Sequence, residues 1–468
     1  MLAAGMLSLL LAGCTVGPDY QAPAMPLAPL PSVTPAPDGG AARPAPPLDR
    51  WWMGFQDPEL TQLIGRALVQ NLGIKAALAR VARARGLAQG AGARLLPAVD
   101  ATSQALAERQ SQESPIDDLG RALVPGFSRN VALYDVGVGA SWEMDLFGGL
   151  RRSEEAAVAE AAAAEAEQLG VRVSVAADAA DAYFQIRGYQ ARLRVVGNQL
   201  DIDGRLLDLV RLQKSKGLAS DREVAQAEAL LAHAQGTVPL LQDAMAVQMN
   251  RLDVLMGAQP GTYAAELASP ADIPAIPSLS TQAADLLHRR PDVIAAERRL
   301  AAANARIGVA TAGYYPRLSL SGLLGFESLD PTRLFQQSTF QPMATAGLRW
   351  RLFDFGSVDA EVAQADAATQ EELMRYRQTV LHAAEDVENA STDLVTLETH
   401  GQAVLREVAA LTRARDESQE AYQIGLIPLT DVLDADRQLL VAQDDLPRTR
   451  ADAARAAVRL YRSLGGGW

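Results

Sequence analysis

Few side chains in this 468-residue chain could support catalysis or metal binding. The four histidines, His233, His288, His382 and His400, share no metal-ligand spacing, and Cys14 is the only cysteine, so neither a zinc cluster nor an internal disulfide can be built. The sequence contains no nucleophile paired with a base, no phosphate-binding loop and no clustered carboxylates at a strand end. We therefore expect no enzyme, no cofactor and no metal site.

Cys14 has the sequence context of a lipid attachment site. It follows an uncharged apolar run at 2–12 that is too short to span a bilayer, and Leu11-Ala12-Gly13-Cys14 resembles the bacterial lipobox. We expect residues 1–13 to be a signal peptide and Cys14 to carry a diacylglyceryl thioether and an N-acyl chain. The alternative is a buried cysteine in an ordinary apolar segment. Signals normally open with Lys or Arg, whereas the first basic residue here is Arg43, which is consistent with a start codon slightly upstream.

The composition favours long helices and argues against nucleic acid as a partner. Acidic residues outnumber basic ones by 56 to 43, and the net charge of −13 would repel a polyanion. Aromatic residues make up 5% of a chain rich in Ala, which is typical of long helices with closely approaching backbones. The Pro-rich residues 14–50 predict an extended, lipid-anchored tether rather than a folded unit.

An internal repeat organises the rest of the chain. The motif Trp142-Glu143-Met144-Asp145-Leu146-Phe147-Gly148 is echoed by Trp350-Arg351-Leu352-Phe353-Asp354-Phe355-Gly356, at an offset of 208 that continues for about 115 residues. Residues 76–97 match 295–316 at an offset of 219. We expect a tandem duplication with a first repeat at 51–257, a linker at 258–280 and a second repeat at 281–468.

Each repeat changes its hydrophobic period twice, from helical spacing to alternation and back. The expected helices span 71–94, 149–214, 221–256, 291–314, 357–423 and 430–464, and the expected strands span 99–107, 136–144, 318–326 and 348–352. The longest helices would measure about 100 Å, and two shorter ones stacked end to end would roughly match each of them. This pattern predicts a cylinder wall of uniform length, bent in both repeats at Pro239 and Pro447.

Four strands with one apolar and one polar face leave two open edges, which lipid does not tolerate because backbone groups there must be paired. We therefore expect oligomerisation, and three copies with twelve strands is the smallest arrangement that encloses a pore. Strand count alone also permits a dimer. A soluble sheet packed on a helical bundle is the alternative, but Trp142 and Trp350 fall toward the same end of their strands, as in an interfacial aromatic belt.

Three stretches resemble the TolC/OprM-type outer-membrane factor lipoproteins. They are Cys14-Thr15-Val16-Gly17-Pro18-Asp19-Tyr20-Gln21-Ala22-Pro23, then Trp51-Trp52 with Phe55, Asp57-Pro58 and Leu60, and the signature at 287–300 followed by Tyr314-Tyr315-Pro316-Arg317-Leu318. The resemblance implies a mainly α-helical chain with a membrane β-barrel. In a homotrimer, four strands from each chain would complete a 12-stranded barrel, continued by a long periplasmic α-helical barrel with an equatorial region at mid-length.

The same resemblance implies a passive, gated exit duct of a tripartite efflux pump that exports drugs or other small toxic compounds. Its partners would be a periplasmic adaptor (a membrane fusion protein), an inner-membrane pump of RND type and outer-membrane lipid. Two other functions stay open within the class, namely an exit duct for type I protein secretion or for metal-ion efflux. From another class, a lipid-anchored periplasmic coiled-coil scaffold would conduct no ions.

Two helical-hairpin turns would carry the contacts of such a channel. The resemblance places Asp431, Asp434 and Tyr422 at the closed periplasmic gate, with Glu223 as the acidic partner on the neighbouring hairpin, and Asp431 and Asp434 share one helical face. A family arginine is replaced here by Ile427, and as an alternative the acids only complement helix dipoles. The tip residues expected to contact the adaptor or pump are Gly217, Leu218, Ala219, Ser220, Gly425, Leu426 and Ile427.

The lipobox generates the first prediction. Cys14 should be acylated, and the mature chain should stay with the membrane fraction, because three acyl chains at about 0.8 kcal/mol per buried methylene far exceed marginal binding. Mass spectrometry of the mature N-terminal peptide checks this, with a Cys14→Ser variant as the unlipidated control. A mature peptide with an unmodified Cys14 would refute it.

Overall fold

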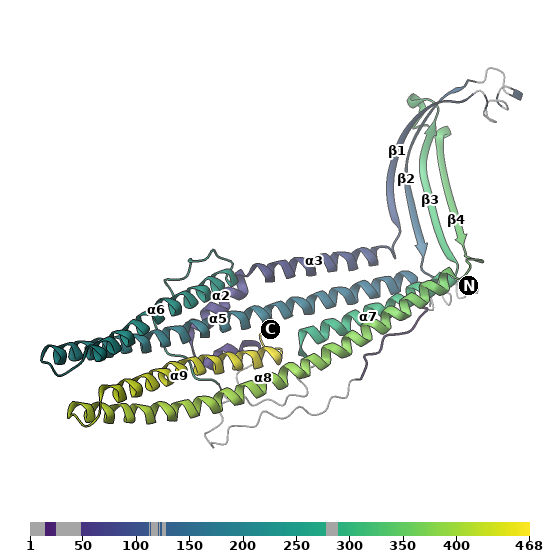
Figure 1. Ribbon diagram of the computed structural model, residues 1–468. Coiled ribbons are helices and arrows are strands. Elements are labelled where there is room, and N and C mark those ends of the chain that lie inside the picture. Colours follow the sequence, from purple (N-terminus) through teal and green to yellow (C-terminus); the bar gives the residue numbers. More distant parts are fainter. Residues whose placement is uncertain are drawn as a thin grey trace. The chain divides into compact units, whose positions relative to one another are not determined.

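The computed structural model describes residues 15–24, 48–111, 113, 120, 122–123, 128–277 and 289–468, so Cys14 lies outside the described residues. The chain divides into two compact units. Unit 1 comprises Met1–Pro23, Ala82–Ala163 and Glu297–Arg375, and unit 2 comprises Ala24–Val81, Ala164–Ala296 and Tyr376–Trp468. Each unit takes segments from both repeats, as the colours of Figure 1 show.

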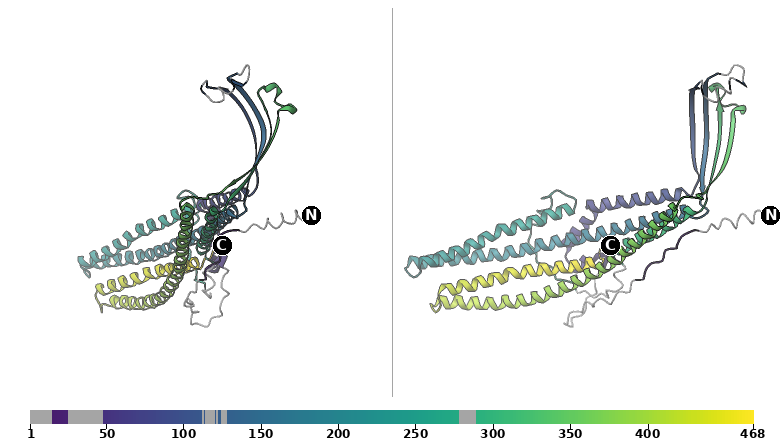
Figure 2. Two further views of the ribbon diagram at one scale, coloured as in Figure 1. Left: turned by 90° about the vertical axis from the view of Figure 1, so that its right-hand side faces the viewer. Right: turned by 45° about the vertical axis from the view of Figure 1, so that its right-hand side comes forward.

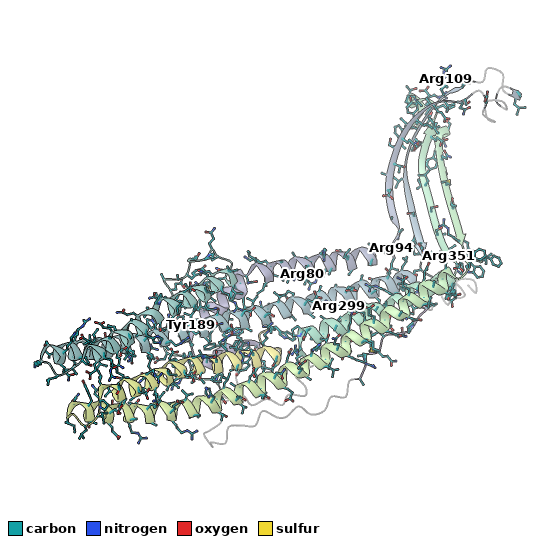
Figure 3. The ribbon with its side chains drawn as sticks, in the orientation of Figure 1. Arg80, Arg94, Arg109, Tyr189, Arg299 and Arg351 are labelled. Carbon is teal, nitrogen blue, oxygen red and sulfur yellow. The ribbon has the colours of Figure 1, made fainter. Side chains whose placement is uncertain are left out.

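Unit 1 contains a four-stranded antiparallel sheet in the order β1-β2-β3-β4. The strands are β1 (Ala98–Arg109), β2 (Asn130–Met144), β3 (Arg317–Ser328) and β4 (Phe340–Arg349). Ten or more residues per strand are enough to cross a bilayer, and Figure 2 shows that the sheet is curved. Figure 3 places Arg109 at one end of the strands, with Arg94 and Arg351 toward the other end. The predicted strands at 99–107, 136–144 and 318–326 are confirmed, including the weakly patterned one that became β1.

The prediction was wrong about where β4 ends. The expected strand at 348–352 overlaps β4 only at Leu348 and Arg349, and Trp350 and Leu352 follow β4 in irregular backbone. The reason is pairing, because Arg349 lies opposite Arg317, the first residue of β3. Residues after Arg349 therefore have no strand beside them in this chain.

The helices fall close to the predicted bounds and repeat each other in length. They are α3 (Leu72–Ala93), α5 (Gly149–Ser215), α6 (Asp221–Leu255), α7 (Pro291–Thr311), α8 (Ser357–Gln423) and α9 (Leu429–Ser463). The helices α5 and α8 have 67 residues each, or about 100 Å, and α6 and α9 have 35 residues each. Among the described helices, none combines the length and the apolar character needed to cross a membrane.

Two elements before α3 were not predicted. A 3-10 helix, η1 (Leu48–Phe55), begins inside the expected tether, and α2 (Pro58–Gln70) follows it. The start of α2 has a local cause: the Asp57 side chain accepts hydrogen bonds from the backbone N–H groups of Glu59 and Leu60, and Pro58 occupies the first turn.

The aromatic core of unit 2 joins the two repeats. Trp51 of η1 is fully buried and stacks on Tyr461 of α9, with ring centroids 5.2 Å apart. Phe55 packs on Phe184 of α5 at 4.9 Å. Burial of rings of this size adds to the hydrophobic stabilisation that buried aliphatic side chains such as Leu60 and Ile64 give this unit.

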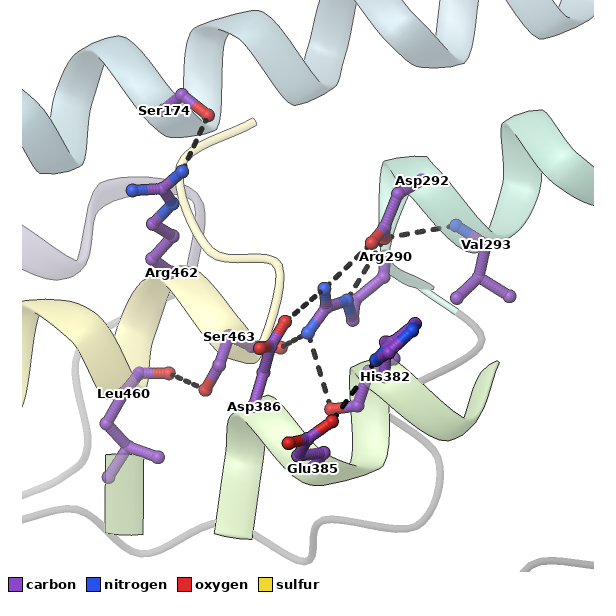
Figure 4. A network of polar contacts seen from close by, with 11 residues as sticks. Ser174, Arg290, Asp292, Val293, His382, Glu385, Asp386, Leu460, Arg462 and Ser463 are labelled. Atoms are coloured by element: carbon purple, nitrogen blue, oxygen red, sulfur yellow. Dashed lines mark hydrogen bonds and ion pairs between the residues drawn. The ribbon is translucent and has the colours of Figure 1, made fainter. Parts of the chain in front are cut away.

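The side chain of Arg290 links three segments of unit 2 (Figure 4). Its guanidinium lies 2.7 Å from Asp292 at the start of α7 and 2.9 Å from Asp386 of α8. It also donates a 3.0 Å hydrogen bond to the carbonyl of Ser463 at the end of α9. The arginine is buried, whereas both carboxylates are about half exposed. Its removal would therefore take away the donor to the carbonyl of Ser463 and would leave no buried charge unpaired.

Arg290→Ala should lower the free energy of unfolding by about 2–3 kcal/mol, because charge-assisted hydrogen bonds to buried acceptors are lost. The neighbouring Arg289→Ala, which removes an exposed side chain, should change it by less than about 0.5 kcal/mol. Thermal unfolding followed by circular dichroism measures both. Equal effects of the two variants would contradict the assigned role of Arg290.

Candidate functional site

The two predicted helical-hairpin turns lie in unit 2 and close in the same way. Figure 1 shows α6 returning beside α5 and α9 returning beside α8. Gly217 (φ +75°) and Gly425 (φ +77°) adopt the left-handed conformation that ends each first helix. The N–H of Leu218 donates to the carbonyl of Gln213, and the N–H of Leu426 donates to that of Ala421, each at 2.9 Å.

These turns expose aliphatic side chains. Leu218, Ile424 and Leu426 are each more than 70% exposed, whereas Ala219 and Ile427 are half-buried. Aliphatic groups gathered at the end of a hairpin, rather than scattered over a surface, are typical of a protein contact. We name the side chains of Leu218, Ile424 and Leu426 the tip patch.

The expected pairing of Tyr422 with Glu223 is not made. The Tyr422 hydroxyl donates instead to Oε1 of Gln213 on the other hairpin, at 2.7 Å. Glu223 caps its own helix: its carboxylate accepts 2.7 Å hydrogen bonds from the backbone N–H and the hydroxyl of Ser220. These bonds lower the pKa of Glu223. Burial, with a smaller contribution from the negative charge of Glu223, raises the pKa of Tyr422.

Asp431 and Asp434 lie in the first two turns of α9, both exposed to solvent. They point away from the buried stripe that contains Leu429 and Val432. Asp434 accepts hydrogen bonds from Arg437 at 2.7 Å and Gln438 at 2.6 Å, and the bond from Arg437 lowers the pKa of Asp434. The two acids therefore form a charged face, whose charge Arg437 offsets in part.

A buried pair of carboxylates near these turns was not predicted. Asp203 of α5 and Asp436 of α9 are 1% and 6% exposed. Oδ1 of Asp203 accepts a 2.7 Å hydrogen bond from Gln199, and its Oδ2 is buried without a hydrogen-bond partner among the described residues. Burial raises the pKa of Asp203 to about 6, with the charge of Asp436 adding to the effect. Burial also raises the pKa of Asp436, although Arg415 opposes this.

The sequence did carry a signal for this pair. Asp436 falls in the apolar stripe of α9, at helical spacing from Leu429, Val432 and Leu439, and all four residues are buried. Asp203 falls in the same way among Val196, Leu207 and Val210 on α5. An acid within an apolar stripe predicts a buried carboxyl group. Within the described ranges, no group of three or more His, Cys, Asp or Glu side chains could hold a metal ion.

The residues directly after Cys14 are fixed to unit 1 and do not form a free tether. Arg152 of α5 is 5% exposed and ion-pairs with Asp19 at 2.7 Å, while its Nε donates to the carbonyl of Val16 at 3.1 Å. Tyr20 donates a 2.7 Å hydrogen bond to Glu297 of α7. Residues 15–24 contain no helix or strand and are held in place by these contacts. The rest of the expected tether lies outside the described part at 25–47 and enters η1 at Leu48–Arg50.

Comparison with known proteins agrees with this architecture. The family described as "Outer membrane efflux protein" matches residues 63–258 and 283–466, so both repeats are covered. The pyoverdine export outer membrane protein OpmQ of Pseudomonas aeruginosa is 32% identical over 451 residues, covering 93% of this chain and 94% of OpmQ. The toluene efflux pump outer membrane protein TtgC of Pseudomonas putida is 30% identical, covering 100% of this chain and 96% of TtgC.

A solved structure shows the same fold. The outer-membrane channel OprN superposes with a TM-score of 0.88 at 33% sequence identity, covering 97% of this chain and all of OprN. A curved antiparallel sheet and paired helical hairpins, built from two repeats, define the class of outer-membrane channel proteins. This chain belongs to the outer membrane efflux protein family.

The raised pKa of Asp203 predicts a pH dependence of stability. Its folded-state pKa of about 6 lies above the unfolded value of about 3.9, so this group destabilises the fold progressively as pH rises from about 4 through 6. Asp203→Asn, which keeps the hydrogen bond from Gln199, should raise stability by up to about 3 kcal/mol near pH 8. This gain should shrink toward zero near pH 4.

Unfolding temperatures measured across this pH range test the prediction. The exposed Asp201→Asn on the same helix serves as the matched control and should follow the wild type. A gain from Asp203→Asn that did not vary with pH would contradict the prediction, because only the titration of Asp203 gives the effect a pH dependence.

Proposed function

We propose that the chain assembles as a homotrimer in which the four-stranded sheets close a 12-stranded outer-membrane barrel and the helical hairpins continue it as a periplasmic tunnel. The observation that carries this proposal is the pair of strand edges, one on β1 and one on β4, that no described strand covers. Unpaired N–H and C=O groups are not tolerated in lipid, and closure by further copies removes both edges.

In this arrangement the protein serves as a passive exit duct of a tripartite efflux pump. Its relatives are named for export of pyoverdine and of toluene, which supports drugs or other small toxic compounds as cargo. Acylated Cys14 would anchor the chain in the outer membrane, with residues 15–20 held against α5 and α7 directly after it.

The tip patch would receive a periplasmic adaptor, which couples the duct to an inner-membrane pump of RND type. Exposed aliphatic side chains at the ends of the two hairpins suit a contact with a protein partner. Gly217 and Gly425 hold both turns in the conformation that presents these side chains.

The gate in this account lies at Asp431 and Asp434, with Tyr422 beside it. Three-fold symmetry would bring six exposed carboxylates toward one axis, where like charges repel and cations are attracted. The closed duct should therefore favour cations, and divalent cations should block it.

Single-channel recording in planar bilayers tests the function and the gate together. Wild-type protein should form cation-selective channels, and Asp431→Ala/Asp434→Ala should weaken both cation selectivity and divalent block. The control Asp366→Ala/Glu407→Ala removes two exposed acids of α8 and should change neither. Absence of conductance would exclude a duct, and a gate variant indistinguishable from the wild type would place the constriction elsewhere.

A further inference from the structure

Two ion pairs connect α5 with α9 within unit 2. Nε of Arg192 on α5 lies 2.8 Å from Oδ1 of Asp444 on α9, and Nε of Arg455 on α9 lies 2.7 Å from Oδ1 of Asp181 on α5. The two contact residues of each helix are eleven positions apart. Eleven residues are close to three helical turns, so the contact residues share one face of each helix. The two helices therefore run side by side, antiparallel and in matched register.

The same register leads to the buried pair of carboxylates. Between the two ion pairs, Gly188 of α5 approaches Ala451 of α9 so closely that a Cβ atom on Gly188 would lie 2.8 Å from that of Ala451. Fifteen residues closer to the hairpin turns on each helix, the corresponding positions are Asp203 and Asp436. Both are buried, and the charge of Asp436 acts on Asp203. The contact nearest the turns thus joins two acids, where the earlier contacts join an acid and a base.

The buried charges at this contact do not balance. The charged groups of α8 that act on it are Arg415, whose Nε lies 3.9 Å from Asp436, and the exposed Asp416. Gln199, which donates to Oδ1 of Asp203, is neutral. One guanidinium offsets one buried carboxylate, and Arg415 lies beside Asp436. Asp203 is left with a buried Oδ2 for which the described residues supply no donor.

We propose that Asp203 binds a proton that holds residues 429–443 of α9 against α5, and that release of this proton to solvent lets them separate. We name residues 429–443 the tip segment. The proton occupies Oδ2 of Asp203, because Oδ1 already accepts the hydrogen bond from Gln199. A neutral Asp203 is not repelled by ionised Asp436. The two ion pairs farther from the turns do not depend on this proton, since arginine stays charged throughout.

The direction and size of the effect follow from the environment of Asp203. Burial raises its pKa to about 6, so the proton is bound at pH 5 and mostly released at pH 7. If separation exposes Asp203, its pKa returns toward about 3.9. Raising the pH therefore favours the separated state, and the packing equilibrium should weaken about tenfold between pH 5 and pH 7.

The tip segment carries Asp431 and Asp434, so its packing matters for a gate, and this consequence rests on the function proposed above. In a duct, the bound proton would fix the charged face of these two acids in position at low pH. Packing of the tip segment on α5 can be measured without any ion current. The proton site and the proposed function can therefore fail separately.

Hydrogen exchange of the full-length protein in lipid nanodiscs tests the inference. After correction for the intrinsic pH dependence of amide exchange, protection of the tip segment should fall about tenfold between pH 5 and pH 7. The rest of α9, residues 444–463, should keep its protection. Asp203→Asn keeps the acceptor for Gln199 but cannot ionise, so it should retain at pH 7 the protection seen at pH 5. The exposed Asp201→Asn is the matched control and should follow the wild type.

Asp436→Asn distinguishes titration of Asp203 from a structural role. It removes the negative charge that acts on Asp203 and leaves Arg415 in place, so the midpoint of the fall in protection should move to lower pH. An unchanged midpoint would overturn the pairing of the two acids. Protection that does not vary with pH in the wild type, or that falls equally in Asp203→Asn, would overturn the proton site.

Infrared spectroscopy of the wild-type protein covers the case in which a variant fails to fold. A C=O band of a buried, protonated carboxylic acid should be present at pH 5 and should disappear with a midpoint near pH 6. Absence of this band would overturn the proton site. If the exchange results hold for a protein that conducts no ions, the proposed function alone is overturned.

Discussion

The backbone hydrogen-bonding groups at the edges of the sheet set the main constraint on this molecule. In the described part of the chain, β1 and β4 each pair with a single strand, so each leaves one row of N–H and C=O groups for another partner. In lipid an unpaired group costs several kcal/mol, so a four-stranded sheet of this length is stable there only as part of a closed assembly. In the proposed assembly, further copies of the chain cover both edges of the sheet.

The tandem duplication meets this constraint by using the same structural unit twice. The helices α5 and α8 are equal in length, as are α6 and α9. Both hairpin turns contain a left-handed glycine and make the same backbone hydrogen bonds. Because both repeats present the same geometry, contacts made once inside the chain can be made again between chains. The repeats differ at the proposed gate: Asp431 of α9 corresponds to another acid, Glu223 of α6, whereas Asp434 corresponds to Gln226.

Much of the fold could be predicted from the sequence because periodicity and a long-range repeat report local structure and topology directly. The long helices and three of the four strands followed from these patterns. The end of β4 did not, because alternation continues to Leu352 while pairing inside the chain stops at Arg349. The periodic pattern did not predict helix α2, because the start of this helix depends on the cap that the Asp57 side chain provides.

The sequence predicted where the turns of the candidate site lie, but it did not predict the hydrogen bonds of their side chains. The turns at Gly217 and Gly425 lie where expected, but Tyr422 bonds Gln213, and Glu223 caps its own helix, since local capping bonds outcompete a contact across hairpins. The burial of Asp203 follows from its place in the apolar stripe of α5, but the lack of a described partner for its Oδ2 depends on packing between helices, which the sequence pattern does not reveal. Electron cryo-microscopy of the protein in lipid nanodiscs tests the central claim most directly. The account predicts a closed ring of twelve strands from three chains, and an open sheet or a ring with another strand number would contradict it.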